Sequence, residues 1–205
     1  MTTVITAKAV SELRQRTGAG MMDCKKALEE NGGDMDASVE YLRKKGIAKA
    51  EKRADRSTSE GIIGGEIFNG SRSGVLVEVA CETDFVARNE DFNSFGKGCC
   101  LAAAAFAPAF LNREAVDAAA VERERAIVVD QTNTAMKGKP QQVIDKAIEG
   151  RMDKFFQAKC FVEMPFVNPE DQNDTRTIEQ ARQWLVGKIG ENIQIRRFHY
   201  MSLGG

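Results

Sequence analysis

Residues 61–79 read GIIGGEIFNGSRSGVLVEV, and this stretch decides the fold because the hydrophobic spacing changes there from helical to extended. Two apolar runs flank a turn rich in glycine and serine at residues 69–74, which is the pattern of a β-hairpin. The alternating run at residues 192–200 can add a further strand to this hairpin. The sequence therefore predicts a small antiparallel sheet.

Upstream of the hairpin, three short helical patterns carry their own start and stop signals. Thr6 can cap the first helix, Asp34 can cap the third, and the glycines of residues 18–20 separate the first from the second. The third helix is expected to close at Gly46. Together these patterns predict a compact three-helix unit.

Downstream of the hairpin, helical patterns alternate with short loops. Asp91 is placed to cap a helix that Pro108 ends. An apolar run at residues 160–162 is expected to form a strand end or an edge, because Pro165 follows it. Further helical patterns cover residues 117–132, 140–156 and about 175–187.

These patterns predict an α+β fold, with a three-helix domain followed by a small antiparallel sheet that helices cover. We expect residues 1–56 to form the N-terminal domain and its basic linker. Residues 57–205 are expected to form the α+β core.

The composition excludes several classes of protein. The chain has 205 residues, of which 42% are hydrophobic and 29% charged, as in ordinary globular proteins. The net charge of -1 gives no general attraction to nucleic acid or to an anionic membrane. The longest apolar run, residues 99–111, is too short to cross a bilayer, and no secretory signal precedes the first helix. We therefore expect a cytoplasmic protein with no membrane partner.

No group of residues points to covalent chemistry. His199 is the only histidine, so neither a histidine-based triad nor a histidine metal site can form. The five cysteines include no C-x-x-C pair and are interpreted as small core residues in a reducing compartment. Residues 18–26 resemble a phosphate loop but lack its glycine spacing and its hydroxyl residue after the lysine. We predict no catalytic residue, no metal and no cofactor.

Two segments leave alternatives open. Residues 43–56 hold seven basic and two acidic side chains, which favours a solvated face but allows an RNA- or ribosome-binding module. In residues 81–91, the apolar pair Phe85 and Val86 can either plug the interior or anchor a partner, and composition alone favours the interior. An enzyme that uses Asp84 or Cys81 is a third hypothesis.

Several blocks of sequence resemble the translation elongation factor Ts family, and they occur in the order typical of that family. The longest are LRQRTGAGMMDCKKAL at residues 13–28 and ETDFVARN at residues 82–89. The others are GIIG at 61–64, GKP at 138–140, MPFV at 164–167 and IGENI at 189–193.

This resemblance implies a guanine nucleotide exchange factor for elongation factor Tu, with a ubiquitin-associated-like N-terminal domain and no enzymatic activity of its own. In the family, a Thr-Asp-Phe-Val segment enters a gap between helices of the partner GTPase and disturbs its magnesium site. That segment corresponds here to Thr83, Asp84, Phe85 and Val86. The N-terminal domain meets the partner near its phosphate loop, which points to Arg14, Thr17, Met21 and Met22.

The chain resembles a short form of the family, with one copy of the core unit that longer members carry twice. The resemblance implies a homodimer that binds elongation factor Tu, with no stable nucleic-acid partner. The candidate dimer residues are Trp184, Phe198, Tyr200 and Met201, for which core packing is an equal alternative.

Overall fold

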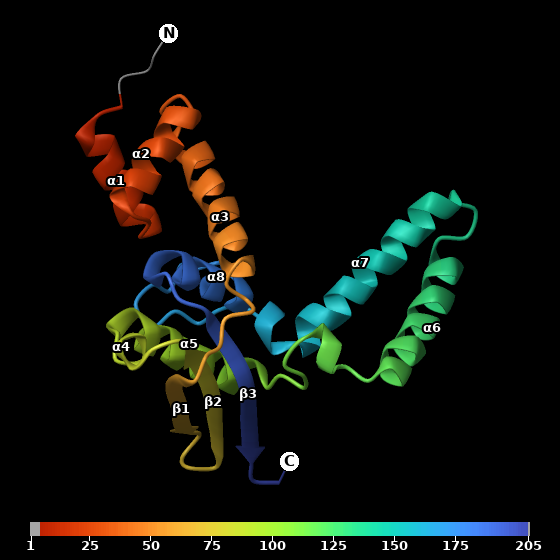
Figure 1. The fold of residues 1–205 in the computed structure, drawn as a ribbon. Helices are drawn as coiled ribbons and strands as arrows, with labels where there is room; N and C mark the ends of the chain where they lie inside the picture. The colour runs from red at the N-terminus through yellow and green to blue at the C-terminus, as the bar shows by residue number, and fades with distance from the viewer. Residues whose placement is uncertain (1–4, 205) are drawn as a thin grey trace. The chain divides into compact units, whose positions relative to one another are not determined.

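The computed structural model describes residues 5–204 and consists of three N-terminal helices followed by a three-stranded antiparallel sheet packed against helices (Figure 1). The N-terminal helices are α1 (Ala7–Thr17), α2 (Met21–Glu30) and α3 (Met35–Glu51). The strands are β1 (Glu60–Phe68), β2 (Ser73–Cys81) and β3 (Ile193–Ser202), in the order β1-β2-β3. The remaining elements are α4 (Asp84–Ala87), α5 (Glu90–Phe106), η1 (Arg113–Ala115), α6 (Ala118–Ala135), α7 (Gln141–Lys159), η2 (Phe161–Glu163) and α8 (Ile178–Ile189). The predicted α+β class is confirmed.

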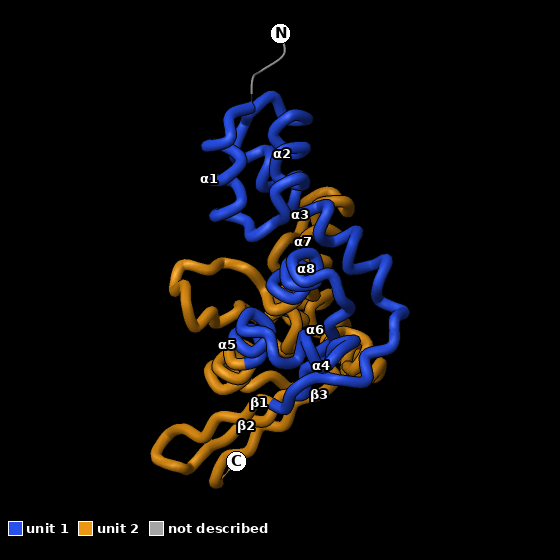
Figure 2. Tube along the Cα trace, turned by 60° about the vertical axis from the view of Figure 1, so that its left-hand side comes forward, with its two compact units in different colours: residues 1–63, 78–96, 180–195 blue, residues 64–77, 97–179, 196–205 orange. Residues whose placement is uncertain are grey.

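The chain divides into two compact units, drawn in two colours in Figure 2. Unit 1 contains the residues up to 63, together with 78–96 and 180–195. Unit 2 contains residues 64–77 and 97–179 and the chain from residue 196 onward. Each unit therefore draws on segments that lie far apart in the sequence.

The three N-terminal helices of unit 1 form the predicted bundle. The Thr6 hydroxyl accepts the Ala9 N–H at 3.2 Å, and the Asp34 carboxylate accepts the Ala37 N–H at 2.8 Å, so both predicted caps are confirmed. Gly18 ends α1 in the left-handed conformation, with φ of 63°. The core of the bundle consists of Val10, Leu13, Cys24, Ala27, Leu28 and Leu42.

The prediction that the third helix closes at Gly46 is wrong, because α3 continues to Glu51. Glycine weakens a helix by about 1 kcal/mol relative to alanine. Helices α3 and α8 approach closely at this point: a Cβ on Gly187 would lie 3.5 Å from the Cα of Gly46, and a Cβ on Gly46 would lie 3.8 Å from the carbonyl oxygen of Gln183. Close packing of α3 and α8 within unit 1 thus overrides the local signal, and much of the predicted basic linker is helical.

Two further expectations require correction. Asn89, and not Asp91, begins α5: its side-chain oxygen accepts the N–H groups of Asp91 and Phe92 at 2.9 and 3.3 Å. Asp91 instead lies in the first turn of α5. The apolar run at 160–162 forms the short 3-10 turn η2, and only isolated bridges occur at Cys160 and Pro165.

One face of the sheet is buried and the other carries exposed apolar side chains. Val75, Val77 and Val79 alternate along β2 on the buried face. On β1 the outward residues include Ile63 and Ile67. This alternation confirms the hairpin that the sequence predicts.

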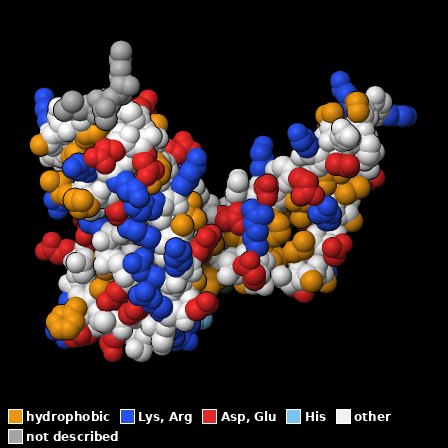
Figure 3. Space-filling view, turned by 45° about the horizontal axis from the view of Figure 1, so that its top comes forward, with side chains coloured by type: hydrophobic (Ala, Val, Ile, Leu, Met, Phe, Trp, Pro, Cys, Tyr) orange, Lys and Arg blue, Asp and Glu red, His pale blue; other side chains and the backbone are white. Residues whose placement is uncertain are grey.

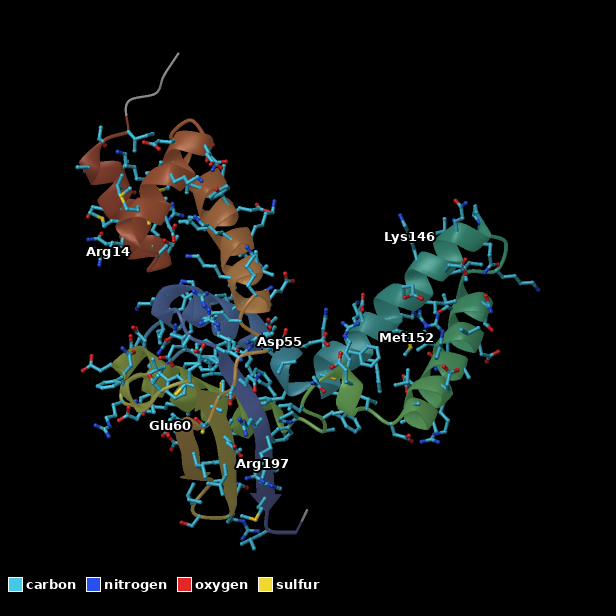
Figure 4. All side chains as sticks on the ribbon, in the orientation of Figure 1. Arg14, Asp55, Glu60, Lys146, Met152 and Arg197 are labelled. Carbon is cyan, nitrogen blue, oxygen red and sulfur yellow. The ribbon has the colours of Figure 1, made fainter. Side chains whose placement is uncertain are left out.

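Helices α6 and α7 of unit 2 form an antiparallel pair with a small core of its own. Val128 of α6 packs with Ile144, Ile148 and Met152 of α7, and Met152 points from α7 toward α6 (Figure 4). Hydrophobic side chains follow the seam between these helices, with charged side chains along its edges (Figure 3). The predicted helices at 117–132 and 140–156 are thereby confirmed.

Candidate partner-binding site

Residues 83–86, which we call the exchange loop, present one aromatic side chain to solvent. Thr83 caps the single turn α4 by accepting the Val86 N–H with its hydroxyl at 3.4 Å. Val86 turns inward and is only 8% exposed, whereas Phe85 points outward and is 80% exposed. The expectation that both side chains turn inward is right for Val86 and wrong for Phe85.

The backbone of the exchange loop is held by Glu191, which precedes β3. One carboxylate oxygen of Glu191 accepts the N–H groups of Glu82 and Thr83 at 3.1 and 3.0 Å. The other oxygen accepts the Thr83 hydroxyl at 2.7 Å. Glu191 lies in the sequence block at 189–193, but no local signal indicates this contact, since 108 residues separate Glu191 from Thr83.

Asp84 and Cys81, the two side chains named in the competing enzyme hypothesis, both interact with other groups of the chain. The carboxylate of Asp84 forms an i,i+4 ion pair with Arg88 at 3.0 Å. Burial, reinforced by the negative charge of Glu191, raises the pKa of the Cys81 thiol to about 11, and the thiol donates to the Thr83 carbonyl at 3.2 Å. A neutral thiol is a poor nucleophile, so Cys81 supports the loop and carries no chemistry.

A second set of candidate residues lies on the bundle, and its members differ in exposure. Met21 and Met22, at the start of α2, are exposed, and Met22 is 76% exposed. Arg14 is exposed on α1 (Figure 4). Thr17 is buried, and its hydroxyl donates to the Leu13 carbonyl at 2.7 Å. The bundle therefore offers Arg14 and the two methionines to a partner and keeps Thr17 inside.

Trp184, a candidate for the dimer interface, packs against the bundle within unit 1. Its indole N–H donates to the Thr17 carbonyl. A Cβ added to Gly18 would lie 2.7 Å from the ring, so the two surfaces touch closely. The Lys188 ammonium lies 5.0 Å from the ring centroid, in the range of a cation–π contact. Trp184 thus fixes the end of α1 against α8.

The other dimer candidates lie on β3 in unit 2. Phe198 packs against Phe161 with ring centroids 5.0 Å apart, and Tyr200 packs against Phe68 at 6.1 Å. Met201 is exposed. Phe198 and Tyr200 therefore cover part of their apolar surface with aromatic rings of the same chain.

Four of the seven basic side chains at residues 43–56 form ion pairs within the chain, which favours the solvated-face interpretation over an RNA surface. In Figure 3, Lys and Arg side chains form a band on this face, and Asp and Glu side chains lie beside it. The ion pairs of this stretch are Lys45–Asp23 at 2.8 Å, Lys49–Asp23 at 2.7 Å, Lys44–Glu40 at 3.4 Å and Arg56–Glu82 at 3.4 Å.

Residues 5–204 hold neither a cluster of metal ligands nor a membrane-spanning helix. This part of the chain contains no group of three or more His, Cys, Asp or Glu side chains placed to hold a metal ion. None of its helices has the length and apolar character that a membrane span requires.

Comparison with known proteins shows likeness over almost the whole chain. A family model described as Elongation factor TS matches residues 49–173. The chain is 46% identical to Elongation factor Ts of Desulforamulus reducens over 98% of its own length and 89% of the relative. The identity is 48% to the protein of that name from Nitratidesulfovibrio vulgaris, over 98% and 97% of the two chains. It is 49% to that from Geobacter metallireducens, over 98% and 90%.

Proposed function

This chain belongs to the elongation factor Ts family, and on that premise we propose that Phe85 is the side chain through which it releases GDP from its partner. The protein is a nucleotide exchange factor for elongation factor Tu and not a catalyst. We place its action in the cytoplasm, where translation takes place.

The observation that carries the proposal is the exposure of Phe85 on a loop whose backbone is fixed. Burying a phenylalanine in a partner contributes on the order of 2 kcal/mol, so an exposed ring that the fold holds outward is suited to act as a wedge. In the proposed mechanism, Thr83 and Val86 set the position of Phe85. Asp84 supplies charge or hydrogen bonds beside the magnesium site of the partner.

Displacing magnesium is an effective way to loosen GDP. The ion is among the largest local charges at a nucleotide site, so the nucleotide loses much of its hold when the ion is displaced. Binding is reciprocal, and a factor that weakens GDP binding is weakened by GDP to the same degree. The exchange factor therefore leaves when fresh nucleotide binds, and no covalent step is needed.

Arg14, Met21 and Met22 are the proposed secondary contacts, with Thr17 supporting them from inside the bundle. Methionine side chains are flexible and polarisable, so they adapt to an irregular partner surface. Their exposure at the start of α2 supports this role. We further propose residues 1–56 as the domain that carries these contacts.

The test is the release rate of fluorescent GDP from elongation factor Tu in the presence of magnesium. We expect the wild-type protein to accelerate release and Phe85→Ala to lower the accelerated rate roughly 30-fold, the equivalent of about 2 kcal/mol. Phe106→Ala is the matched control, because it removes another exposed phenylalanine, from unit 2. Equal rates for wild type and a folded Phe85→Ala variant would refute the wedge.

We also propose that two copies pair through the outer face of the sheet. Within unit 2, Ile67 and Leu76 lie on this face above two glycines: a Cβ on Gly65 would lie 2.9 Å from Leu76, and a Cβ on Gly74 would lie 2.8 Å from Ile67. Met201 of β3 is exposed as well. An exposed apolar face of this kind supports docking of a second sheet.

The oligomeric state in solution tests this proposal. We expect a dimeric mass for the wild type and a monomeric mass for Ile67→Lys, by sedimentation or light scattering. Val143→Lys is the control, because it adds the same charge at an exposed apolar position on α7. A wild-type protein that is monomeric at micromolar concentration would contradict the dimer.

A further inference from the structure

The exchange loop depends on a carboxylate from another part of the chain. The three donors that meet Glu191 all belong to Glu82 and Thr83, the two residues directly before α4. We propose that Glu191 is a positioning residue for nucleotide exchange, which acts by holding Phe85 outward. The inference rests on the function proposed above for Phe85.

The chemistry of the site requires a group that only accepts hydrogen bonds. Two N–H groups and one hydroxyl converge on two oxygens, and an ionised carboxylate is the side chain that matches this demand. A glutamine has the same shape, but it would turn an NH₂ donor toward one of these donors. We call the three hydrogen bonds that Glu191 accepts from Glu82 and Thr83 the clamp. Glu191→Gln therefore weakens the clamp with little change in volume, and Glu191→Ala removes it.

The contact with the Thr83 hydroxyl also fixes the direction of the helix cap. Because that hydroxyl gives its one proton to Glu191, its lone pairs are left for the Val86 N–H, which it accepts at 3.4 Å. Glu191 thereby sets where α4 begins. The start of α4 in turn decides that Val86 faces the interior and Phe85 faces solvent.

The clamp works against the preference of the side chains themselves. Phe85 is the larger apolar residue of the pair and gains more from burial than Val86. If the clamp is lost, the loop is free to populate conformations that bury Phe85, and the fraction of molecules able to engage the partner falls.

The base of the clamp is rigid, because the residue after Glu191 is anchored independently. Asn192 is fully buried, and its side-chain NH₂ donates to the carbonyls of Ala54 and Arg56 at 3.1 and 2.8 Å. Its backbone N–H donates to the Glu82 carboxylate at 2.6 Å. The Glu191 carboxylate thus binds the backbone N–H of Glu82, and the Glu82 carboxylate binds the backbone N–H of Asn192, which fixes the loop to the start of β3 at two points.

The experiment measures the loop and the exchange reaction separately. In Glu191→Ala we expect the amide hydrogens of Glu82 and Thr83 to exchange with solvent about tenfold faster, measured by NMR on the free protein. We expect GDP release from elongation factor Tu to be accelerated about tenfold less, and Glu191→Gln to give an intermediate value in both measurements. The control is Glu163→Gln, which disrupts the two-contact pair with Arg113 at 2.5 and 2.7 Å in unit 2.

A double variant distinguishes positioning from general support of the fold. If Glu191 acts through Phe85, then Glu191→Ala lowers exchange by less than about twofold once Phe85 is already alanine. A full tenfold loss in that background, or unchanged amide exchange in the single variant, would overturn the proposal. If Phe85→Ala lowers exchange and Glu191→Ala does not, the inference fails and the proposed function of Phe85 stands. If Phe85→Ala has no effect, both fail.

Discussion

Two exposed apolar segments of unit 1 are each held in place by a carboxylate, and the two carboxylates bind different kinds of chemical group. In the bundle turn, residues 18–22, the methionines are followed directly by Asp23, which binds the ammonium groups of Lys45 and Lys49 at 2.8 and 2.7 Å. In the exchange loop, Glu191 binds backbone amides and a hydroxyl. A clamp on the backbone fixes which side chain faces out, whereas an ion pair between side chains fixes only the packing of α2 on α3.

The exposed side chains match this difference. Phenylalanine has two rotatable bonds and a rigid ring, so a fixed backbone places it with little loss of entropy on binding. Methionine adapts its shape after contact and needs no such precision. We infer that the exchange loop supplies a fixed anchor and the bundle turn an adaptable contact.

The largest expected effect is on the free energy of unfolding, when a substitution in the bundle turn disrupts its contact with Trp184. Gly18→Ala places a Cβ 2.7 Å from the Trp184 ring at a residue with φ of 63°, and we expect a loss of about 2 to 3 kcal/mol in the free energy of unfolding. Gly32→Ala is the matched control, because φ is 61° there and the space is open, so it should lose only about 1 kcal/mol. Denaturant unfolding measures both. Equal losses would mean that the Trp184 contact is not tight.

The second prediction compares the two exposed segments by placing leucine at one position in each. Phe85→Leu removes a rigid ring from a fixed position and is expected to lower the saturating rate of GDP release about tenfold, or about 1.4 kcal/mol. Met22→Leu replaces one adaptable apolar side chain by another and is expected to change the rate and the apparent affinity by less than about twofold. The dependence of GDP release on exchange-factor concentration separates rate from affinity. A larger effect at Met22 than at Phe85 would reverse the assignment.

Much of the fold follows from local sequence signals. The caps at Thr6 and Asp34, the glycine that ends α1 and the hairpin at residues 61–79 are each determined by neighbouring residues, and the structure confirms them. The end of α3 could not be predicted at Gly46, because the reason that the helix continues there is its packing against α8. Predictions from neighbouring residues fail where contacts with a distant segment stabilise the observed structure.

The same limit applies to the candidate site. The sequence identified residues 83–86 through the family resemblance, but composition alone gave the wrong orientation for Phe85. Its orientation depends on Glu191, and the contact of Trp184 with Thr17 spans 167 residues. Contacts of this range leave no periodic trace in one sequence, so only the structure reveals them.

The smallest expected effect concerns the ion pairs of Asp23 with Lys45 and Lys49 in the bundle. Hydrogen bonds from Lys45 and Lys49 hold the pKa of Asp23 below the value of about 3.9 that an unfolded chain shows. The stabilisation by this carboxylate is therefore fully present above pH 3.9 and is lost as the pH falls through the lower folded pKa. The contact with Asp23 raises the pKa of Lys45, so that contribution is present below about pH 10.4 and is lost above it.

Asp23→Asn should consequently lower the free energy of unfolding by about 1 kcal/mol at every pH between 5 and 9, and the difference should shrink as the pH falls below 3.9. It should also shrink in 1 M salt, where the Debye length is about 3 Å. Asp36→Asn is the control, because its pair with Arg16 at 3.1 Å lies in the same bundle and is far more exposed. If the difference is as large in 1 M salt, Asp23 stabilises the bundle by positioning groups, as Glu191 is proposed to do, and not by charge. The contrast between the Asp23 ion pairs and the Glu191 hydrogen bonds would then disappear.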